Sequence, residues 1–572
     1  MTPTTSSALS QALTGLGERY FDVQHRYDPY NATLLGISDV DHLAGDPRLA
    51  ASEQAAADLD AIGREVARLD LSGATEAELV DHGVMTSLVR GAGDDARHAL
   101  WATNASPNGY VSRQGLVFQA VPAMTTGDDE SRGRYLERLS GLGGYFTALG
   151  ERYAMEASRG RVPTRLGVLR SVQQLEGYLA LAVADDVLLG PARASGDAET
   201  LSRATALVER EVRPAMADLA ARLTAELLPV GRVGDRVGIH AVPGGAEGYQ
   251  AAVRRHTTTD LTADEIHRIG LDELEQMRAE WSAIGRRALG EEDVSRIAAR
   301  MRGDRSLRFE TTDEIVAVAR GALARAEAVR DEWFPAIAIP ACVVEEINPI
   351  DAGNSALGYY RPPAVDGSRP GAYCVLAHDP TSHYRYEYEA LSFHESVPGH
   401  HLQLATAQLL DIPRYRRHLD VEACSFNEGW GLYSEQLADE MGLYSDDLSR
   451  LGMLSFRALR ACRLVVDTGL HHLGWTREQA IDFMFDHTAT TREHVTSEVD
   501  RYIAWPGQAL AYLIGRREIV RLRSGAEQRL GTRFSVIDFH AAVLGHGAVP
   551  LTVLAEIVER WTASTVAPRR NS

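Results

Sequence analysis

The chain has 572 residues, of which 45% are hydrophobic and 24% are charged. This length and composition predict a globular protein with a large core and more than one structural lobe. A formal net charge of -20 argues against a general nucleic-acid-binding protein and against adhesion to an anionic membrane surface.

The first half of the chain, from residue 8 to about residue 333, has hydrophobic residues at helical spacing in long amphipathic segments. The clearest predicted helices cover residues 81–101, 130–157, 198–227 and 262–289. Thr262 and Glu265 have the spacing of a capping box at the start of the last one. Because no cluster of reactive side chains accompanies these helices, residues 1–335 are predicted to form a helical scaffold and cleft-wall lobe.

Residues 337–378 show a different pattern, with the short β-prone runs AIPACVVEEI, SALGYYRP and GAYCVLAH separated by turn residues. The pattern predicts a small antiparallel sheet directly before the motif HESVPGHH. Such a sheet could offer an edge strand to an extended substrate, or it could only cover the cleft.

Helical patterns return after the sheet, at residues 386–410, 422–441, 447–473, 476–485, 508–522 and 551–562. No internal repeat or clear linker divides the chain. We therefore expect a mainly α protein with one continuous fold. It would be a large two-lobed helical body with a deep cleft, in which residues 336–572 form a catalytic lobe with the small sheet and the metal-binding helices.

The motif HESVPGHH, from His394 to His401, combines candidate metal ligands with a candidate base. In H-E-x-x-H on a helix, two histidines one turn apart bind zinc beside the glutamate. Here Pro398 replaces the second histidine. On an undistorted helix His401 would lie about 10 Å further along the axis, too far for a shared ion. Because Pro398-Gly399 permits a kink or bulge, we interpret the motif as an interrupted H-E-x-x-H in which His400 returns toward His394, with His401 as the alternative ligand.

A third ligand is expected because a catalytic zinc usually has three protein ligands and one open position. The segment FNEGWGLYSE supplies Glu428, with Glu435 two turns further along the same face. One of them could bind the metal while the other holds a histidine N–H. Most glutamates are solvated helix charges, but the apolar neighbours of these two favour a compensated, buried role.

The segments HESVPGHHLQ, NEGWGLYSE and RYIAWPGQALAYLIGRREI resemble the bacterial family named domain of unknown function 885. More distantly, the pattern is similar to that of the thimet-oligopeptidase-type zinc metallopeptidases. The resemblance implies a mainly helical fold with a deep cleft, His394, His400 and Glu428 as zinc ligands, and Glu395 as general base. The Pro398-Gly399 insertion departs from the peptidase motif.

The chemistry implied is amide hydrolysis, in which Glu395 takes a proton from water and the zinc polarises the scissile carbonyl. A neutral donor should stabilise the oxyanion that forms, and the candidates are Tyr512, Tyr502 and His471. The alternative for each is a buried structural side chain with its polar atoms satisfied.

Substrate contacts are predicted for Gln508, which precedes a helix, and for Arg501, Arg385 and Arg361, which could bind a substrate carboxylate in a bidentate manner. A surface ion pair is the alternative for any single arginine. All 59 cationic residues are arginine, because the sequence contains no lysine. This excludes a pyridoxal Schiff base, a lysine nucleophile and a P-loop lysine.

The sequence as a whole favours a zinc-dependent metallopeptidase that hydrolyses short peptides. Two alternatives stay open: a metal-dependent hydrolase of a non-peptide amide or ester, and a metal-free binding protein with a degenerate site. The expected partner is a peptide or small amide, with no nucleic acid and no membrane. The N-terminus has no cationic start followed by an apolar run, so a cytoplasmic protein is expected. Cleavage specificity, the physiological metal and the oligomeric state are not indicated.

Overall fold

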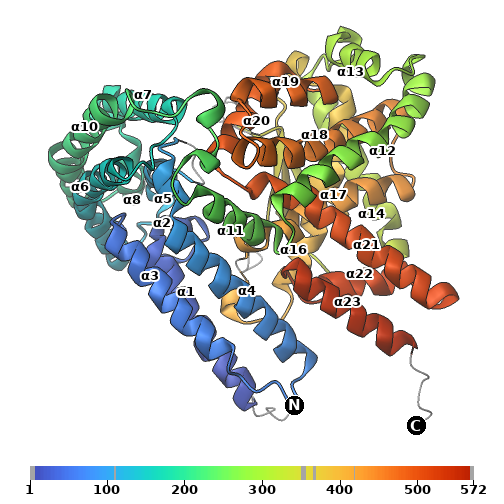
Figure 1. Ribbon diagram of the computed structural model, residues 1–572, viewed down its shortest axis with the longest axis horizontal. Helices are drawn as coiled ribbons and strands as arrows, with labels where there is room; N and C mark the ends of the chain where they lie inside the picture. The colour runs from blue at the N-terminus through green and yellow to red at the C-terminus, as the bar shows by residue number, and fades with distance from the viewer. Residues whose placement is uncertain (1–6, 108–110, 349–355, 365–368, 418, 567–572) are drawn as a thin grey trace.

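The protein is mainly helical with one small sheet, as the sequence predicted (Figure 1). The computed structural model describes residues 7–107, 111–348, 356–364, 369–417 and 419–566. The predicted helices at 130–157 and 262–289 correspond closely to α6 (Asp129–Ser158) and α12 (Ala263–Leu289). Among the described helices, none is both long enough and apolar enough to cross a membrane.

The N-terminal helices gather at the left of Figure 1, in blue to teal, and those between residues 113 and 222 share a core that contains Phe118, Tyr135, Phe146 and Leu219. The helices are α1 (Ala8–Tyr27), α2 (Pro29–Leu34), α3 (Leu49–Val66), α4 (Glu76–His98), α5 (Arg113–Ala123), α6 (Asp129–Ser158), α7 (Arg165–Ala180), α8 (Gly190–Ser195), α9 (Ala198–Leu207) and α10 (Arg213–Arg222). The three long helices before residue 99 contribute Leu16, Leu59 and Val84 to the core of the C-terminal helices instead.

The remaining helices gather at the right of Figure 1 around a long buried helix, α18. They are α11 (Gly245–Thr257), α12 (Ala263–Leu289), α13 (Val294–Gly303), α14 (Thr312–Trp333), α15 (Tyr388–Glu395), α16 (His400–Gln408), α17 (Cys424–Glu440), α18 (Asp447–His471), α19 (Arg477–His487), α20 (Arg492–Ala504), α21 (Ala511–Leu530), α22 (Val536–Leu544) and α23 (Leu551–Val566). Because α12 packs along α18, residues 263–333 lie with the C-terminal helices, although the sequence division at 335 assigns them to the first lobe.

The sheet is mixed, so the prediction of an antiparallel sheet is wrong for one of its two strand pairs. Its order is β1 (Cys342–Glu346), β3 (Gly371–Val375), β2 (Gly358–Arg361), with β3 parallel to β1 and antiparallel to β2. The reason is burial: every residue of β3 is buried, whereas β1 and β2 are partly exposed. The most apolar strand takes the centre, and two chain reversals then leave β1 and β3 pointing the same way.

The motif segment forms two helices instead of the single helix predicted over residues 386–410. Helix α15 ends at Glu395, and α16 begins at His400. Between them lie Ser396 to Gly399, with a cis peptide bond between Val397 and Pro398. Proline cannot continue the helical hydrogen-bond ladder, which explains why the helix stops here. The predicted helix over residues 422–441 corresponds closely to α17.

Candidate metal centre

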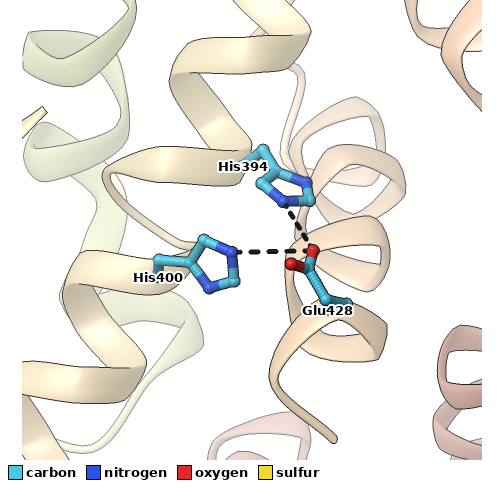
Figure 2. Close-up of side chains that lie close together, drawn as sticks. All are labelled: His394, His400 and Glu428. Atoms are coloured by element: carbon cyan, nitrogen blue, oxygen red, sulfur yellow. Dashed lines mark ion pairs between the residues drawn. The ribbon is translucent and has the colours of Figure 1, made fainter. Parts of the chain in front are cut away.

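Three side chains from three helices meet where α15 ends and α16 begins (Figure 2). His394 is near the end of α15, His400 begins α16, and Glu428 lies in the second turn of α17. The Nε2 atom of His394 lies 3.4 Å from Oε2 of Glu428, and Nε2 of His400 lies 3.9 Å from the same oxygen. One ligand atom from each residue lies within 4.8 Å of the other two. The interrupted motif therefore brings together His394, His400 and Glu428.

The spacing and type of these donors fit a zinc ion. Donors bound at about 2.0–2.2 Å around a tetrahedral zinc lie roughly 3.3–3.5 Å apart. The separation of His394 and Glu428 already matches this value, and His400 needs only a small shift toward both. Two histidines and one carboxylate are a common ligand set for a catalytic zinc that keeps one position open.

Two glycines allow α17 and the segment after α15 to pack closely against His394. A Cβ atom on Gly431 would lie 2.5 Å from Cε1 of the His394 ring, and one on Gly399 would lie 1.9 Å from the His394 carbonyl oxygen. The loop is also held by α17, because the Trp430 indole N–H donates to the Pro398 carbonyl at 3.0 Å. The residues between the two histidines are thus fixed against the helix that carries Glu428.

His394 has a defined orientation because Glu435, also on α17, accepts a hydrogen bond from its Nδ1 at 2.8 Å. That bond leaves Nε2 facing Glu428 and His400, as metal binding requires. Burial lowers the pKa of His394, but hydrogen bonds to Glu428 and Glu435 outweigh it and raise the pKa to about 10. The two carboxylates therefore favour a positive charge at this position, and a bound cation meets the same need.

The surroundings of the second histidine, His400, favour its neutral form. Burial and the His394 charge lower the pKa of His400 to about 4, so its ring is neutral and able to bind a metal near pH 7. Its Nδ1 lies 3.4 Å from Oε1 of Gln403. The Gln403 amide in turn donates to Oδ1 of Asn427 at 2.6 Å, which links α16 to α17 beside Glu428.

His401, the alternative ligand, lies on the side of α16 that faces the sheet. Its Nδ1 is 3.0 Å from the Tyr360 hydroxyl, and its Nε2 is 3.0 Å from the Pro340 carbonyl oxygen. Both ring nitrogens are therefore engaged away from His394. Of the two candidates, the geometry brings His400 into the metal group and leaves His401 outside it.

Glu395 follows His394 directly and is 8% exposed. Burial raises its pKa to about 7, although the charge of His394 and, less strongly, a hydrogen bond from the Tyr360 main chain oppose the rise. A carboxyl group with a pKa near 7 can both accept and return a proton at neutral pH. Glu395 thus has the environment expected of a general base beside the metal group.

The three predicted oxyanion donors differ in what they contact. Tyr512, on α21, is half-buried, and the Glu428 charge adds to burial in raising its pKa, which places it close to the metal group. The hydroxyl of Tyr502 is buried and donates to Glu498 at 2.6 Å. His471 accepts from the Ile239 N–H at 3.0 Å and contacts the Tyr502 carbonyl at 2.9 Å. Only Tyr512 is brought toward the metal group, and the other two have structural contacts.

The predicted substrate-binding residues also separate into two groups. Arg501 donates to the side-chain oxygen of Gln508 at 2.6 Å, and the Gln508 amide lies 3.5 Å from the Tyr512 hydroxyl. These two residues therefore line the region of Tyr512. Arg385 is instead paired with Glu314 at 2.8 Å, a half-exposed ion pair away from this group.

Sequence reasoning missed two buried arginines of α18, Arg460 and Arg463. The Arg460 charge acts on Glu395, and the Arg463 charge acts on Glu428. A signal for them was present in the segment MLSFRALRACRLVVDTGL, where arginines interrupt an otherwise apolar helical stretch. Charged residues are almost never fully buried without a partner, so such interruptions indicate a polar site.

A cavity of about 1120 Å³ that is open to solvent does not include the three donors of the metal group in its described lining. It lies between the N-terminal helices and the segments 421–422 and 504–506, and it is lined by Trp101, Arg255 and Glu422 among others. After burial, the charges of Glu422 and Glu428 both raise the pKa of Asp420, to about 6. The cavity wall and the metal group are therefore neighbours.

Comparison with known proteins gives a family and similar solved structures. A family model described as "Bacterial protein of unknown function (DUF885)" matches residues 29–558. A structure described as a "putative lipoprotein" from Colwellia psychrerythraea is 26% identical, with a TM-score of 0.87 over 98% of this chain and 100% of that one. A second, described as a "putative lipoprotein of unknown function" from Shewanella oneidensis, is 20% identical, with a TM-score of 0.77 over 96% of this chain and 99% of that one, and shows the fold alone. No curated protein matches the chain.

Proposed function

The chain belongs to the bacterial family of unknown function DUF885, and on that premise we propose that it is a zinc-dependent metallopeptidase that hydrolyses short peptides. The observation that carries the proposal is the convergence of His394, His400 and Glu428, with one ligand atom from each within 4.8 Å of the others. The likeness to thimet-oligopeptidase-type peptidases is part of this proposal.

The neighbouring side chains support hydrolysis better than a purely structural metal site. A structural zinc is closed by four protein ligands, whereas this group supplies three. Glu395 is buried next to His394 with its pKa raised to about 7. A zinc ion held by the three donors would polarise a substrate carbonyl and favour deprotonation of water.

In this proposal each residue has a separate role. Glu395 takes a proton from the attacking water and returns it to the leaving amine. Glu435 keeps the His394 ring in one tautomer through the 2.8 Å contact with Nδ1. Tyr512, whose raised pKa keeps its hydroxyl protonated at neutral pH, donates a hydrogen bond to the oxyanion. The cavity bounded by Trp101 and Glu422 serves as the substrate cleft between the two lobes.

The test is metal analysis of the purified protein, combined with digestion of a mixed-sequence peptide library followed by mass spectrometry. We expect about one zinc per chain and peptide cleavage that stops on addition of a chelator and returns with zinc. A protein that binds no transition metal and cleaves no peptide contradicts the proposal. Cleavage of esters or non-peptide amides in place of peptides would keep the metal site and change the substrate class.

Two neighbouring histidines provide a matched pair of variants. His400→Gln removes a proposed ligand and should lower zinc affinity and activity together. His401→Gln changes the adjacent residue, whose contacts are with Tyr360 and Pro340, and should retain zinc. Loss of zinc from His401→Gln with retention by His400→Gln would reverse the assignment of the second ligand.

The cellular location is a separate question from the chemistry. We propose the cytoplasmic location that the sequence predicted. Both matched structures belong to proteins described as a "putative lipoprotein", so fractionation of cells that express the full chain is the deciding measurement.

A further inference from the structure

Two guanidinium groups beside the metal group share one carboxylate. Nη2 of Arg463, on α18, donates to Glu498 at 2.8 Å, and Arg501, on α20, donates to the same carboxylate at 3.1 Å through both Nε and Nη2. His494 adds no charge near pH 7, because burial lowers its pKa. The cluster of Arg463, Arg501 and Glu498 therefore carries an excess positive charge.

Arg463 is nine-tenths buried, yet its hydrogen bonds are incomplete. Its side chain is 9% exposed, and its Nε donates to the Tyr502 hydroxyl at 2.9 Å. Within the part of the chain that the structure describes, its Nη1 is buried and has no acceptor. Buried polar groups nearly always have hydrogen-bond partners, so an unpaired guanidinium nitrogen indicates a place for a ligand.

The Arg463 guanidinium lies close to Tyr512 and to the metal group. The Arg463 guanidinium carbon lies 4.2 Å from the centre of the Tyr512 ring. Tyr512 lies within reach of two opposite charges, since Glu428 raises its pKa and Arg463 lowers it. The Arg463 charge also acts directly on Glu428. Tyr512 thus connects the metal group with the arginine cluster.

We propose that Arg463 binds the free C-terminal carboxylate of a peptide substrate, with Arg501 in support. An excess positive charge and an unpaired N–H suit a planar carboxylate, and charge-assisted hydrogen bonds from arginine are strong and directional. A C-terminal amide would leave the charge uncompensated. This inference rests on the proposed peptidase function and names its substrates as short peptides with a free C-terminus.

The three arginines that the sequence predicted for carboxylate binding do not offer the same opportunity. Arg361 is paired with Glu345 at 2.6 Å on the sheet, and Arg385 with Glu314 at 2.8 Å. Arg501 is already committed through Nε and Nη2 to Glu498 and through Nη1 to Gln508. Among the arginines considered for carboxylate binding, Arg463 has both the burial and the unpaired donor that a substrate carboxylate needs.

The experiment compares a mixed-sequence tetrapeptide library in two forms, with a free C-terminal carboxylate and with a C-terminal amide, on the zinc-loaded full chain. We expect kcat/KM for the free acids to exceed that for the amides by about tenfold to hundredfold, the size of a charge-assisted hydrogen bond. In Arg463→Gln the acid rate should fall and the ratio should approach one. Equal rates for both forms in the wild type, or an unchanged ratio in Arg463→Gln, would overturn the inference.

A matched control lies on the same helix. Arg457 is paired with Glu273 of α12 at 3.0 Å, so Arg457→Gln also removes one arginine ion pair from α18. It should leave the acid-to-amide ratio unchanged. If Arg463→Gln does not fold, Arg463→Lys keeps the charge beside Glu498 without the forked donor pair. Its ratio should fall to an intermediate value, and an unchanged ratio in Arg463→Lys contradicts the proposal.

Binding measurements separate failure of this inference from failure of the peptidase function. Calorimetry with the same two libraries on the Glu395→Gln variant reports affinity without turnover. If the wild type cleaves neither library but the free acids bind more tightly through Arg463, the peptidase function fails and the carboxylate site stands. If the wild type cleaves peptides but free acids and C-terminal amides have the same affinity and the same kcat/KM, the peptidase function stands and the carboxylate site fails.

Discussion

Arg138, on α6 in the N-terminal group, and Arg463, on α18 beside the metal group, are both buried. They differ in whether every guanidinium nitrogen has a hydrogen-bond acceptor. Arg138 donates through Nε to the Leu43 carbonyl at 2.8 Å, through Nη1 to the Thr33 hydroxyl at 2.7 Å and through Nη2 to the Val40 carbonyl at 2.9 Å. Arg463 leaves Nη1 without an acceptor among the described residues. A buried charge with every donor used holds the fold together, whereas one with a donor to spare can hold a ligand.

Buried carboxylates show the same contrast between the two regions. Glu156, on α6, accepts from Arg152 at 2.8 Å and from Arg161 at 2.7 Å. Within the described part of the chain, Glu395 forms no ion pair at all, and burial raises its pKa to about 7. The difference indicates that Glu156 stabilises structure and that Glu395 is kept reactive.

The largest expected effect comes from Glu395→Gln, which removes a reactive carboxylate and preserves its shape. Loss of a general base should lower kcat by roughly 10²–10⁴-fold. The protein should keep its zinc, and its free energy of unfolding should not fall, because a buried charge without an ion-pair partner is removed. Peptide kinetics, metal analysis and urea denaturation check these outcomes. Retained turnover would remove Glu395 from the role of base.

Arg138→Met should give the largest loss of stability. It leaves Asp41, which lies 3.7 Å from Nη2, without its cation, and three acceptors without donors. Breaking a buried pair in this way costs about 3–5 kcal/mol. Urea denaturation measures the change, and the folded fraction should keep its zinc and its relative rates on the two peptide libraries. A loss no larger than that of an exposed substitution would show that complete hydrogen bonding does not mark a structural arginine.

Asp467→Asn tests an intermediate case, a buried carboxylate with neutral donors. Asp467 accepts from the Tyr249 hydroxyl at 2.6 Å and from the Gly507 N–H at 3.1 Å, and burial raises its pKa to about 7. A pKa raised above the unfolded value near 3.9 means that the stability contributed by this group is full below pH 3.9 and is lost as pH rises to about 7. Asparagine does not titrate.

The variant should therefore gain stability relative to the wild type between pH 4 and pH 8, by roughly 1–3 kcal/mol. Paired urea denaturation curves at several pH values measure this difference, and any constant offset from the substitution cancels. A difference that does not change with pH would mean that Asp467 keeps its ordinary pKa.

The smallest effect is expected for Arg385→Gln. Arg385 and Glu314 form a half-exposed ion pair, and such pairs contribute about 0–1 kcal/mol. The preference for free acids over C-terminal amides should stay the same, because Arg385 is paired with Glu314 of α14. A collapse of that preference would move the carboxylate site from Arg463 to Arg385.

Much of the helical scaffold could be predicted because its signals are local. Thr262 and Glu265 form the expected capping box. The helix that the spacing of apolar residues predicts, α12, ends at Leu289 as expected. Strand order in the sheet could not be predicted in the same way. It depends on which strand the surrounding helices bury most, and the sequence runs of β1, β2 and β3 are similar in length and character.

The metal group was partly predictable for a related reason. His394, Glu395 and Glu428 stand in recognisable motifs, whereas the position of His400 depends on how Pro398 and Gly399 end one helix and allow another to start. Arg463 was not predictable from a motif, because the chain has so many arginines. Its burial, its unpaired nitrogen and its contact with the Tyr512 ring distinguish it together, and all three arise from the packing of α18 against distant segments.

The glycine contact between α17 and α21 has a mechanical consequence. A Cβ atom on Gly515 would lie 1.7 Å from the Ser425 carbonyl oxygen, and one on Gly429 would lie 2.6 Å from Gly515, so the two helices touch through their backbones. Glu428 on α17 and Tyr512 on α21 are therefore held rigidly relative to each other, because almost no side chain separates the two helices at this contact. If the site opens to admit a peptide, α17 and α21 should move together, and hydrogen exchange should be slow at this seam.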